Sequence, residues 1–124
     1  MTLSKIHLEL ARSPEFPNGS ADHGFEFVAP LNNDGFIDID EWRKQKEKCR
    51  VVRFWGSQEH ELGHLVRKPG GSWAFHYDIH GDEDDEDTGY RFGAHQLRIG
   101  EYISIKDHDD DEMHTFKIMS VQPV

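Results

Sequence analysis

The chain has 124 residues, which suffices for one domain with a hydrophobic core but not for two comfortable ones. A net charge of −10 would repel phosphate backbones, so nucleic-acid binding is disfavoured. Three Trp, three Tyr and eight Phe are more aromatic residues than a disordered chain normally carries. The chain lacks the run of about 18 apolar residues that a membrane span requires, and its start is not that of a signal peptide. With a single cysteine, Cys49, these features predict a folded domain in the reducing cytoplasm.

The charge is concentrated in the second half of the chain. Residues 76–124 hold 4 basic against 13 acidic residues, and we expect exposed acidic loops near residues 80–88 and 107–112. A local basic stretch covers residues 43–53. It is typical of a solvated helix face, although it can also dock on the acidic half or on an acidic patch of a partner.

Alternating apolar and polar residues predict strands. In chain order they cover residues 4–10, 24–28, 50–55, 72–79, 90–92, 102–106 and 115–121. A short α-helix is predicted over residues 38–48, because Asp38 or Asp40 can cap its start and lysines follow at its end. About seven short strands and one helix predict a mainly β fold, a small antiparallel β-barrel or rolled sheet.

The sequence His60-Glu61-Leu62-Gly63-His64 matches the zinc-peptidase pattern His-Glu-x-x-His. On a helix, His60 and His64 would share one face as zinc ligands and Glu61 would be the general base. A third ligand is required, but Glu83, Glu86, His95 and Asp107 are all candidates in a chain this rich in acids and histidines. A zinc-dependent hydrolase is therefore one alternative.

A strand is the alternative conformation for the same residues. Pro69-Gly70-Gly71 has turn chemistry directly before the strand at residues 72–79, and the natural hairpin partner is residues 62–67. Along a strand, residues 60 and 64 lie about 13 Å apart, too far to share a metal ion. A tight two-residue turn would place Leu62, His64 and Val66 on the face of Phe75 and Tyr77. We favour this hairpin.

Residues 32–41 resemble the second part of a calcium-binding EF-hand loop. With Gly35 at the sharp turn, Asn32, Asp34, Asp38 and Glu41 fall on ligand positions. However, Pro30 stands at the first ligand position and offers no side-chain oxygen. A plain turn that leads into a helix is the better interpretation, and a Ca²⁺- or Mg²⁺-binding domain, here or at the acidic loops, remains a second alternative.

Metal ligands can also come from the strand at residues 72–79. His76, Asp78 and His80 alternate there and can supply two ligands, although surface histidines are the commoner case. Cys49 opens an apolar run, which predicts a buried, inert thiol.

Several short segments have a familiar order. They are residues 7–12, 53–56, 69–75, 89–93 and 100–105. Together they resemble a group of small uncharacterised proteobacterial proteins over most of the chain. The resemblance implies a bacterial, cytoplasmic protein and carries over no catalytic residue.

A credible catalytic set is missing from the sequence, and its charge is distributed unevenly. We therefore expect a non-enzymatic binding module whose partner is another protein, with no cofactor, no nucleic acid and no membrane.

Overall fold

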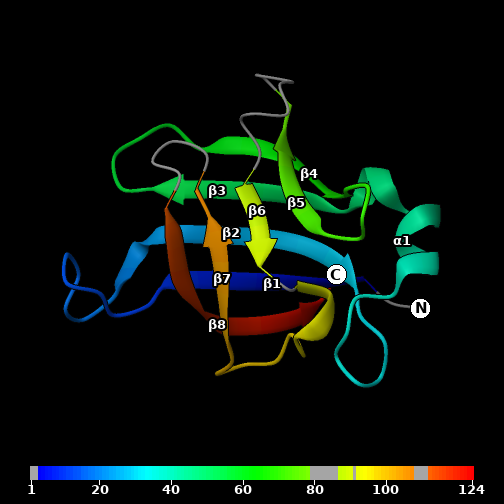
Figure 1. Cartoon of the computed structure of the whole chain (residues 1–124), viewed down its shortest axis with the longest axis horizontal. Coiled ribbons are helices and arrows are strands. Elements are labelled where there is room, and N and C mark those ends of the chain that lie inside the picture. The colour runs from blue at the N-terminus through cyan, green and yellow to red at the C-terminus, as the bar shows by residue number, and fades with distance from the viewer. Residues whose placement is uncertain (1–2, 79–86, 91, 108–111) are drawn as a thin grey trace.

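The computed structural model describes residues 3–78, 87–90, 92–107 and 112–124. Within them, eight antiparallel strands close into a barrel in which each strand pairs with the next and β8 pairs with β1 (Figure 1). The strands are β1 (Leu3–Leu10), β2 (Ser20–Pro30), β3 (Arg50–Trp55), β4 (Glu61–Arg67), β5 (Trp73–Tyr77), β6 (Asp87–Tyr90), β7 (Tyr102–Lys106) and β8 (Met113–Pro123). The predicted antiparallel β-barrel is confirmed.

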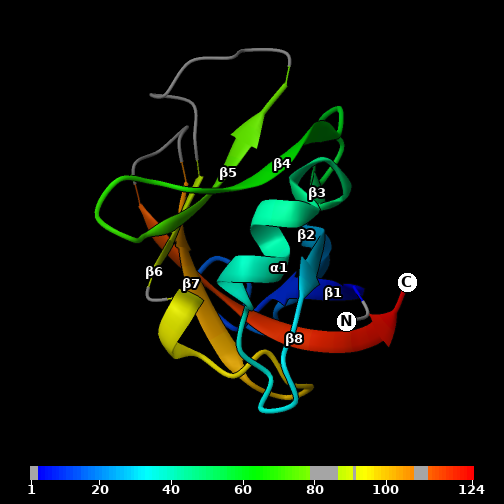
Figure 2. The ribbon, with the colours of Figure 1, turned by 90° about the vertical axis from the view of Figure 1, so that its right-hand side faces the viewer.

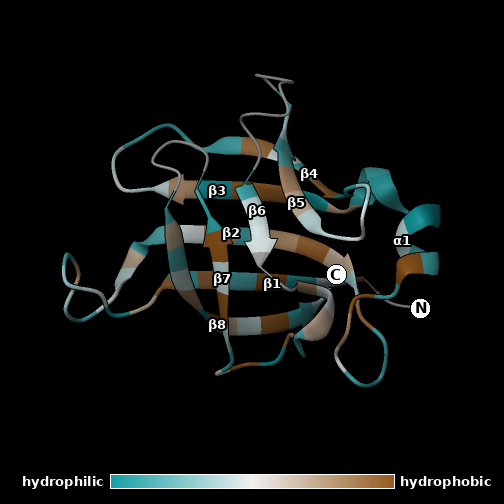
Figure 3. Cartoon of the chain, viewed as in Figure 1, coloured by the Kyte–Doolittle hydropathy of each residue, from teal (hydrophilic) through white to brown (hydrophobic). Residues whose placement is uncertain are grey.

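The inside of the barrel is filled by side chains. Alternate residues of each strand point inward, so bands of opposite hydropathy follow one another along β1 and β8 (Figure 3). Phe25, Phe27, Phe75 and Phe116 contact one another through their rings at centroid distances of 5.1 to 5.2 Å. Closure leaves no strand at the edge of the sheet and packs these rings into one core.

A short helix closes one end of the barrel, which we call the helix end. The predicted helix over residues 38–48 is present as α1 (Ile39–Lys44) followed by the 3-10 helix η1 (Lys46–Lys48). Asp38 caps α1 by accepting the N–H of Glu41. Figure 2 looks onto this end, with α1 in front of the strands.

Trp42 anchors α1 to the barrel. Its buried indole N–H donates to the carbonyl of Leu65 over 3.0 Å, and its ring meets Trp73 edge to face at 5.1 Å. A second 3-10 helix, η3 (Phe92–Ala94), places the buried Phe92 in the same core.

The hairpin of β4 and β5 exists, but its predicted facing was wrong. Leu65 lies opposite Phe75, and His64 lies opposite His76. Five residues, 68–72, connect the strands, with Gly70 and Gly71 both at positive φ. The odd-numbered connection shifts the register by one residue relative to a two-residue turn, and such a shift exchanges the two faces of a strand. Leu62, expected inside, is therefore 47% exposed.

The opposite end of the barrel, where β1, β3, β5 and β7 finish, is called the loop end. Among the described residues it carries the connections at residues 11–19 and 56–60 (Figure 1). None of the helices in the described part of the chain is long and apolar enough to cross a membrane.

Candidate binding site

The zinc-peptidase pattern does not lie on a helix. Glu61 and His64 belong to β4, and His60 precedes that strand. The shared helix face that this zinc site requires is therefore not formed. His64 instead donates from Nδ1 to a carboxylate oxygen of Asp78 over 2.9 Å.

The other metal-ligand candidates do not converge on one site. His76 lies opposite His64 on the outer wall, and Asp78 also faces Arg50 at 3.8 Å. His95 follows η3, whereas Asp107 is buried at the loop end. His80, Glu83 and Glu86 lie outside the described residues, as does most of the acidic run at residues 82–87. Within the residues that the structure describes, no three His, Cys, Asp or Glu side chains are arranged to hold a metal ion.

The calcium-loop candidates form a turn and a helix cap. Asn32 accepts the N–H groups of Asp34 and Phe36 through its side-chain oxygen, and Gly35 has a φ of +87°. Asp38 is the cap of α1, and Glu41 accepts from Gln45. Their oxygens serve the local backbone and the helix, which agrees with the plain turn favoured from the sequence.

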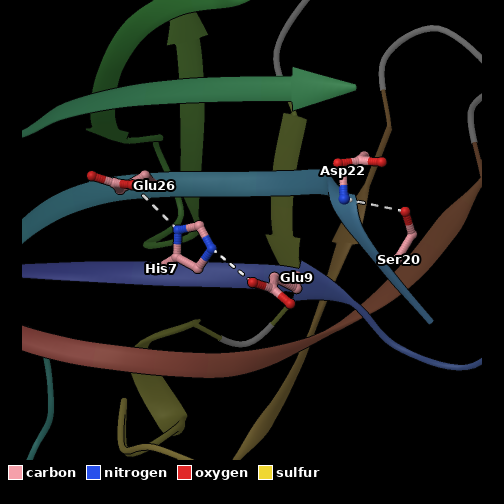
Figure 4. Close-up of polar contacts among 5 residues, drawn as sticks. All are labelled: His7, Glu9, Ser20, Asp22 and Glu26. Atoms are coloured by element: carbon pink, nitrogen blue, oxygen red, sulfur yellow. Dashed lines mark hydrogen bonds and ion pairs between the residues drawn. The ribbon is translucent and has the colours of Figure 1, made fainter. Parts of the chain in front are cut away.

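A polar cluster on the outer wall joins β1 to β2 (Figure 4). The two nitrogens of His7 lie 3.0 Å from Glu9 and 3.2 Å from Glu26, and Lys5 lies 3.1 Å from Glu26. Partial burial alone would raise the pKa of Glu26, but Lys5 and His7 outweigh it and lower that pKa. The cluster therefore reinforces strand pairing across the barrel wall.

One hydroxyl has the spacing of a nucleophile next to a base. Ser20 Oγ lies 2.7 Å from His23 Nδ1. The same oxygen accepts the N–H of Asp22, as Figure 4 shows. Both bonds span two or three residues at the start of β2, which is how a hydroxyl closes a turn. His23 also packs edge to face on Trp55 at 4.8 Å, so its role at the loop end is packing.

Charged side chains are buried inside the loop end. Arg53 of β3 is only 2% exposed, and its guanidinium lies 2.9 Å from Asp107 and 3.7 Å from Asp87. The hydroxyl of Tyr77 donates to Asp87 over 2.5 Å. Part of the basic stretch thus docks on the acidic half of the same chain. The cluster ties together β3, β5, β6 and the end of β7.

The surroundings of Arg53 and Tyr77 hold both side chains in their protonated forms. Burial alone would lower the pKa of Arg53, but Asp107, Asp87 and Tyr77 raise it, so the guanidinium stays charged. Burial, and then the adjacent Asp87, raise the pKa of Tyr77 well above its ordinary value. Arg53 therefore supplies a fixed positive charge beneath the loop end, and Tyr77 a fixed hydrogen-bond donor.

Trp55 lies directly above this cluster and is half-buried. Its ring stacks on the Arg53 guanidinium at 4.7 Å, and His114 lies 5.7 Å from it. Beside it is a pocket of about 420 Å³, lined by Leu10, Ser13, Pro14, Glu15, Phe16, Trp55, Glu112, Met113 and His114. An aromatic ring held from several sides next to a hollow is typical of a binding anchor point.

Two larger hollows lie elsewhere on the described surface and are more open. The first, about 860 Å³ at the helix end, has Arg98 as its one charged lining residue, and that guanidinium donates to the carbonyl of Asp34. The second, about 730 Å³ on the outer wall, mixes Glu9 with Arg12 and Lys117. The loop-end pocket differs because its charged lining residues, Glu15 and Glu112, are both acidic.

The sequence analysis missed the residues of this site. Arg53 stands at an inward-facing position within the apolar run of β3, and that placement was the available signal. Asp87 and Asp107 were counted with the acidic loops, yet they are 0% and 5% exposed. Their partner could not be named from spacing alone, because it lies far away in the sequence.

Comparison with known proteins identified no family model, no curated protein and no solved structure that matches this chain.

Proposed function

We propose that this protein is a non-enzymatic binding module of the cytoplasm that holds a segment of another protein at the loop end of its barrel. The observation that carries the proposal is the pocket beside Trp55. Protein-binding sites concentrate their binding energy in a few well-held aromatic and arginine residues surrounded by near-neutral contacts.

The contacts around Trp55 favour a binding role over a catalytic one. Arg53, His23 and His114 all contact the ring, so little side-chain freedom remains to be lost when a partner binds. The buried charges beneath it are occupied with one another: Arg53 with Asp107 and Asp87, and Asp87 with Tyr77. A cluster of this kind fixes the floor of a site.

Selection of peptides from a random display library on the purified protein tests this proposal. We expect selected peptides to bind wild type, and Trp55→Leu to weaken them about 30-fold, the loss typical of an aromatic anchor. Tyr102→Leu is the matched control, because Tyr102 is 53% exposed on the outer wall and lines the second hollow and not the loop-end pocket. Circular dichroism verifies that both variants fold.

Peptides that lose affinity with Tyr102→Leu and keep it with Trp55→Leu would contradict the assigned site. A library that yields no peptide above background would argue against the binding function itself.

A further inference from the structure

The lining of the loop-end pocket combines apolar side chains with acidic ones. Leu10, Phe16 and Trp55 supply the apolar surface, and Glu15 and Glu112 supply two carboxylates. None of the described residues that line it is Lys or Arg. The pocket is therefore complementary to a group that is apolar along its length and positive at its end.

The two carboxylates come from separate parts of the chain. Glu15 belongs to the connection between β1 and β2, and Glu112 directly precedes β8. Both residues are exposed. A compact ammonium group has three donors that point in different directions, so it can contact carboxylates from separate segments, whereas a planar guanidinium pairs best with one carboxylate in a fork.

The positive charge of Arg53 does not oppose such a ligand. Its guanidinium is 2% exposed and faces two carboxylates, Asp107 and Asp87. Its charge is thus offset beneath the ring of Trp55. A cation in the pocket meets the field of Glu15 and Glu112 on a chain with a net charge of −10.

We propose that the pocket holds an alkylammonium group, the side chain of a lysine in the partner protein. The aliphatic stem lies along Leu10, Phe16 and Trp55, as lysine stems do on apolar surfaces, and the ammonium lies at the Glu15 and Glu112 carboxylates. This inference rests on the proposed function and specifies the chemistry that the same site recognises.

Three short peptides test the inference by nuclear magnetic resonance titration of the wild-type protein. They are acetyl-Gly-Lys-Gly-amide and its counterparts with norleucine, which keeps the stem without the charge, and glutamate. We expect the lysine peptide to shift the Trp55 indole resonance and to bind about tenfold more tightly than the norleucine peptide, the equivalent of one charged contact. The glutamate peptide should not bind.

Two double variants test whether the preference for the lysine peptide comes from the pocket carboxylates. Glu15→Gln with Glu112→Gln should bring lysine and norleucine binding to within about twofold of each other, since the pocket then lacks its carboxylates. Asp40→Asn with Glu47→Gln removes the same net charge at the helix end, where both residues are exposed, and should leave the tenfold preference intact.

Each contrary outcome has a distinct meaning. Equal binding of the lysine and norleucine peptides would overturn the ammonium inference and leave the loop-end pocket as a protein-binding site. Equal loss in both paired variants would attribute the preference to overall charge and also overturn it. If neither peptide shifts Trp55, the inference fails, whereas the proposed function is judged separately by library-selected peptides with Trp55→Leu.

Discussion

The two ends of the barrel are closed by opposite kinds of interaction. At the helix end, Trp42 and Trp73 pack edge to face, and the one buried indole donor of Trp42 reaches a backbone carbonyl. At the loop end, the buried residues include Arg53, Asp87 and Asp107, joined by ion pairs. Apolar packing needs no exact partner geometry, but a buried charge does. The positions of side chains are therefore fixed more exactly at the loop end, which also contains the pocket.

The largest effect on stability is expected from a substitution of Arg53 at the loop end. Arg53→Met removes the cationic partner of two buried carboxylates, so we expect the free energy of unfolding to fall by about 3–5 kcal/mol. Arg50→Met on the same strand is the control, because Arg50 is exposed and only 3.8 Å from Asp78 at best, and it should cost less than about 1 kcal/mol. Urea denaturation measures both, and equal losses would contradict the assigned role of Arg53.

A smaller loss is expected at the helix end. Trp42→Phe keeps an aromatic ring but removes the donor to the Leu65 carbonyl, which leaves a buried acceptor unsatisfied at a cost of about 1–3 kcal/mol. Binding of library-selected peptides should be unchanged, because this end does not contribute to the pocket. Unaltered urea stability, or altered peptide affinity, would show that the two ends are not independent.

The dependence of unfolding free energy on alkaline pH tests the buried thiol of Cys49 at the helix end, which is neutral in the folded protein. Burial, followed by the charge of Glu47, raises the pKa of Cys49 from 9.0 to about 11. Because the folded state holds this proton more tightly, the stabilisation is complete below pH 9 and is lost as the pH rises toward 11.

We expect Cys49→Ala to remove a decline of about 1–2 kcal/mol from that pH window. The measurement is urea stability at a series of alkaline pH values, with wild type and variant compared so that the similar contribution of Tyr77 cancels. Identical slopes would contradict this prediction, and so would rapid reaction of the native thiol with a thiol-specific reagent.

The smallest effect is expected on the outer wall, between the two ends. The lowered pKa of Glu26 means that its stabilisation is present above pH 4.5 and is lost as the pH falls below that value. Glu26 is 37% exposed, and solvent screening limits the effect of Glu26→Gln to less than about 0.5 kcal/mol. Acid unfolding curves measure it, and a loss comparable to that of Arg53→Met would place a major determinant of stability on the wall.

Local pattern was enough to predict most of the strands but not how they face one another. The strand expected over residues 90–92 was misplaced, because β6 covers Asp87–Tyr90 and the 3-10 helix η3 begins at Phe92. The alternation in β7 and the apolar run of β3, which stops before Gly56, predicted the bounds of these two strands. The connection at residues 68–72 was harder, since its five residues, in place of the expected two, shift the register by one and exchange the faces of β4. The positive φ of both Gly70 and Gly71 is a property of the folded turn, and their residue type does not reveal it, because glycine adopts positive and negative φ with similar ease.

The candidate site was less predictable than the fold. An arginine in an apolar strand indicates a buried partner, but the chain offers 24 acidic residues, and composition alone does not select Asp87 and Asp107 among them. The position of Trp55 above Arg53 follows only once the barrel has closed. The zinc pattern at residues 60–64 was misleading in the opposite way. Its residue types match the motif, but Glu61 and His64 lie on a strand, where the two histidines cannot share one helix face.

The three tryptophans provide the most direct test of the division between the two ends. Trp55 lies at the loop-end pocket, whereas Trp42 and Trp73 pack together at the helix end. In nuclear magnetic resonance spectra of the wild-type protein titrated with a library-selected peptide, we predict that the Trp55 indole N–H resonance shifts progressively to saturation. The resonances of Trp42 and Trp73 should remain in place. Movement of those two with Trp55 unchanged would contradict the assignment of binding to the loop end.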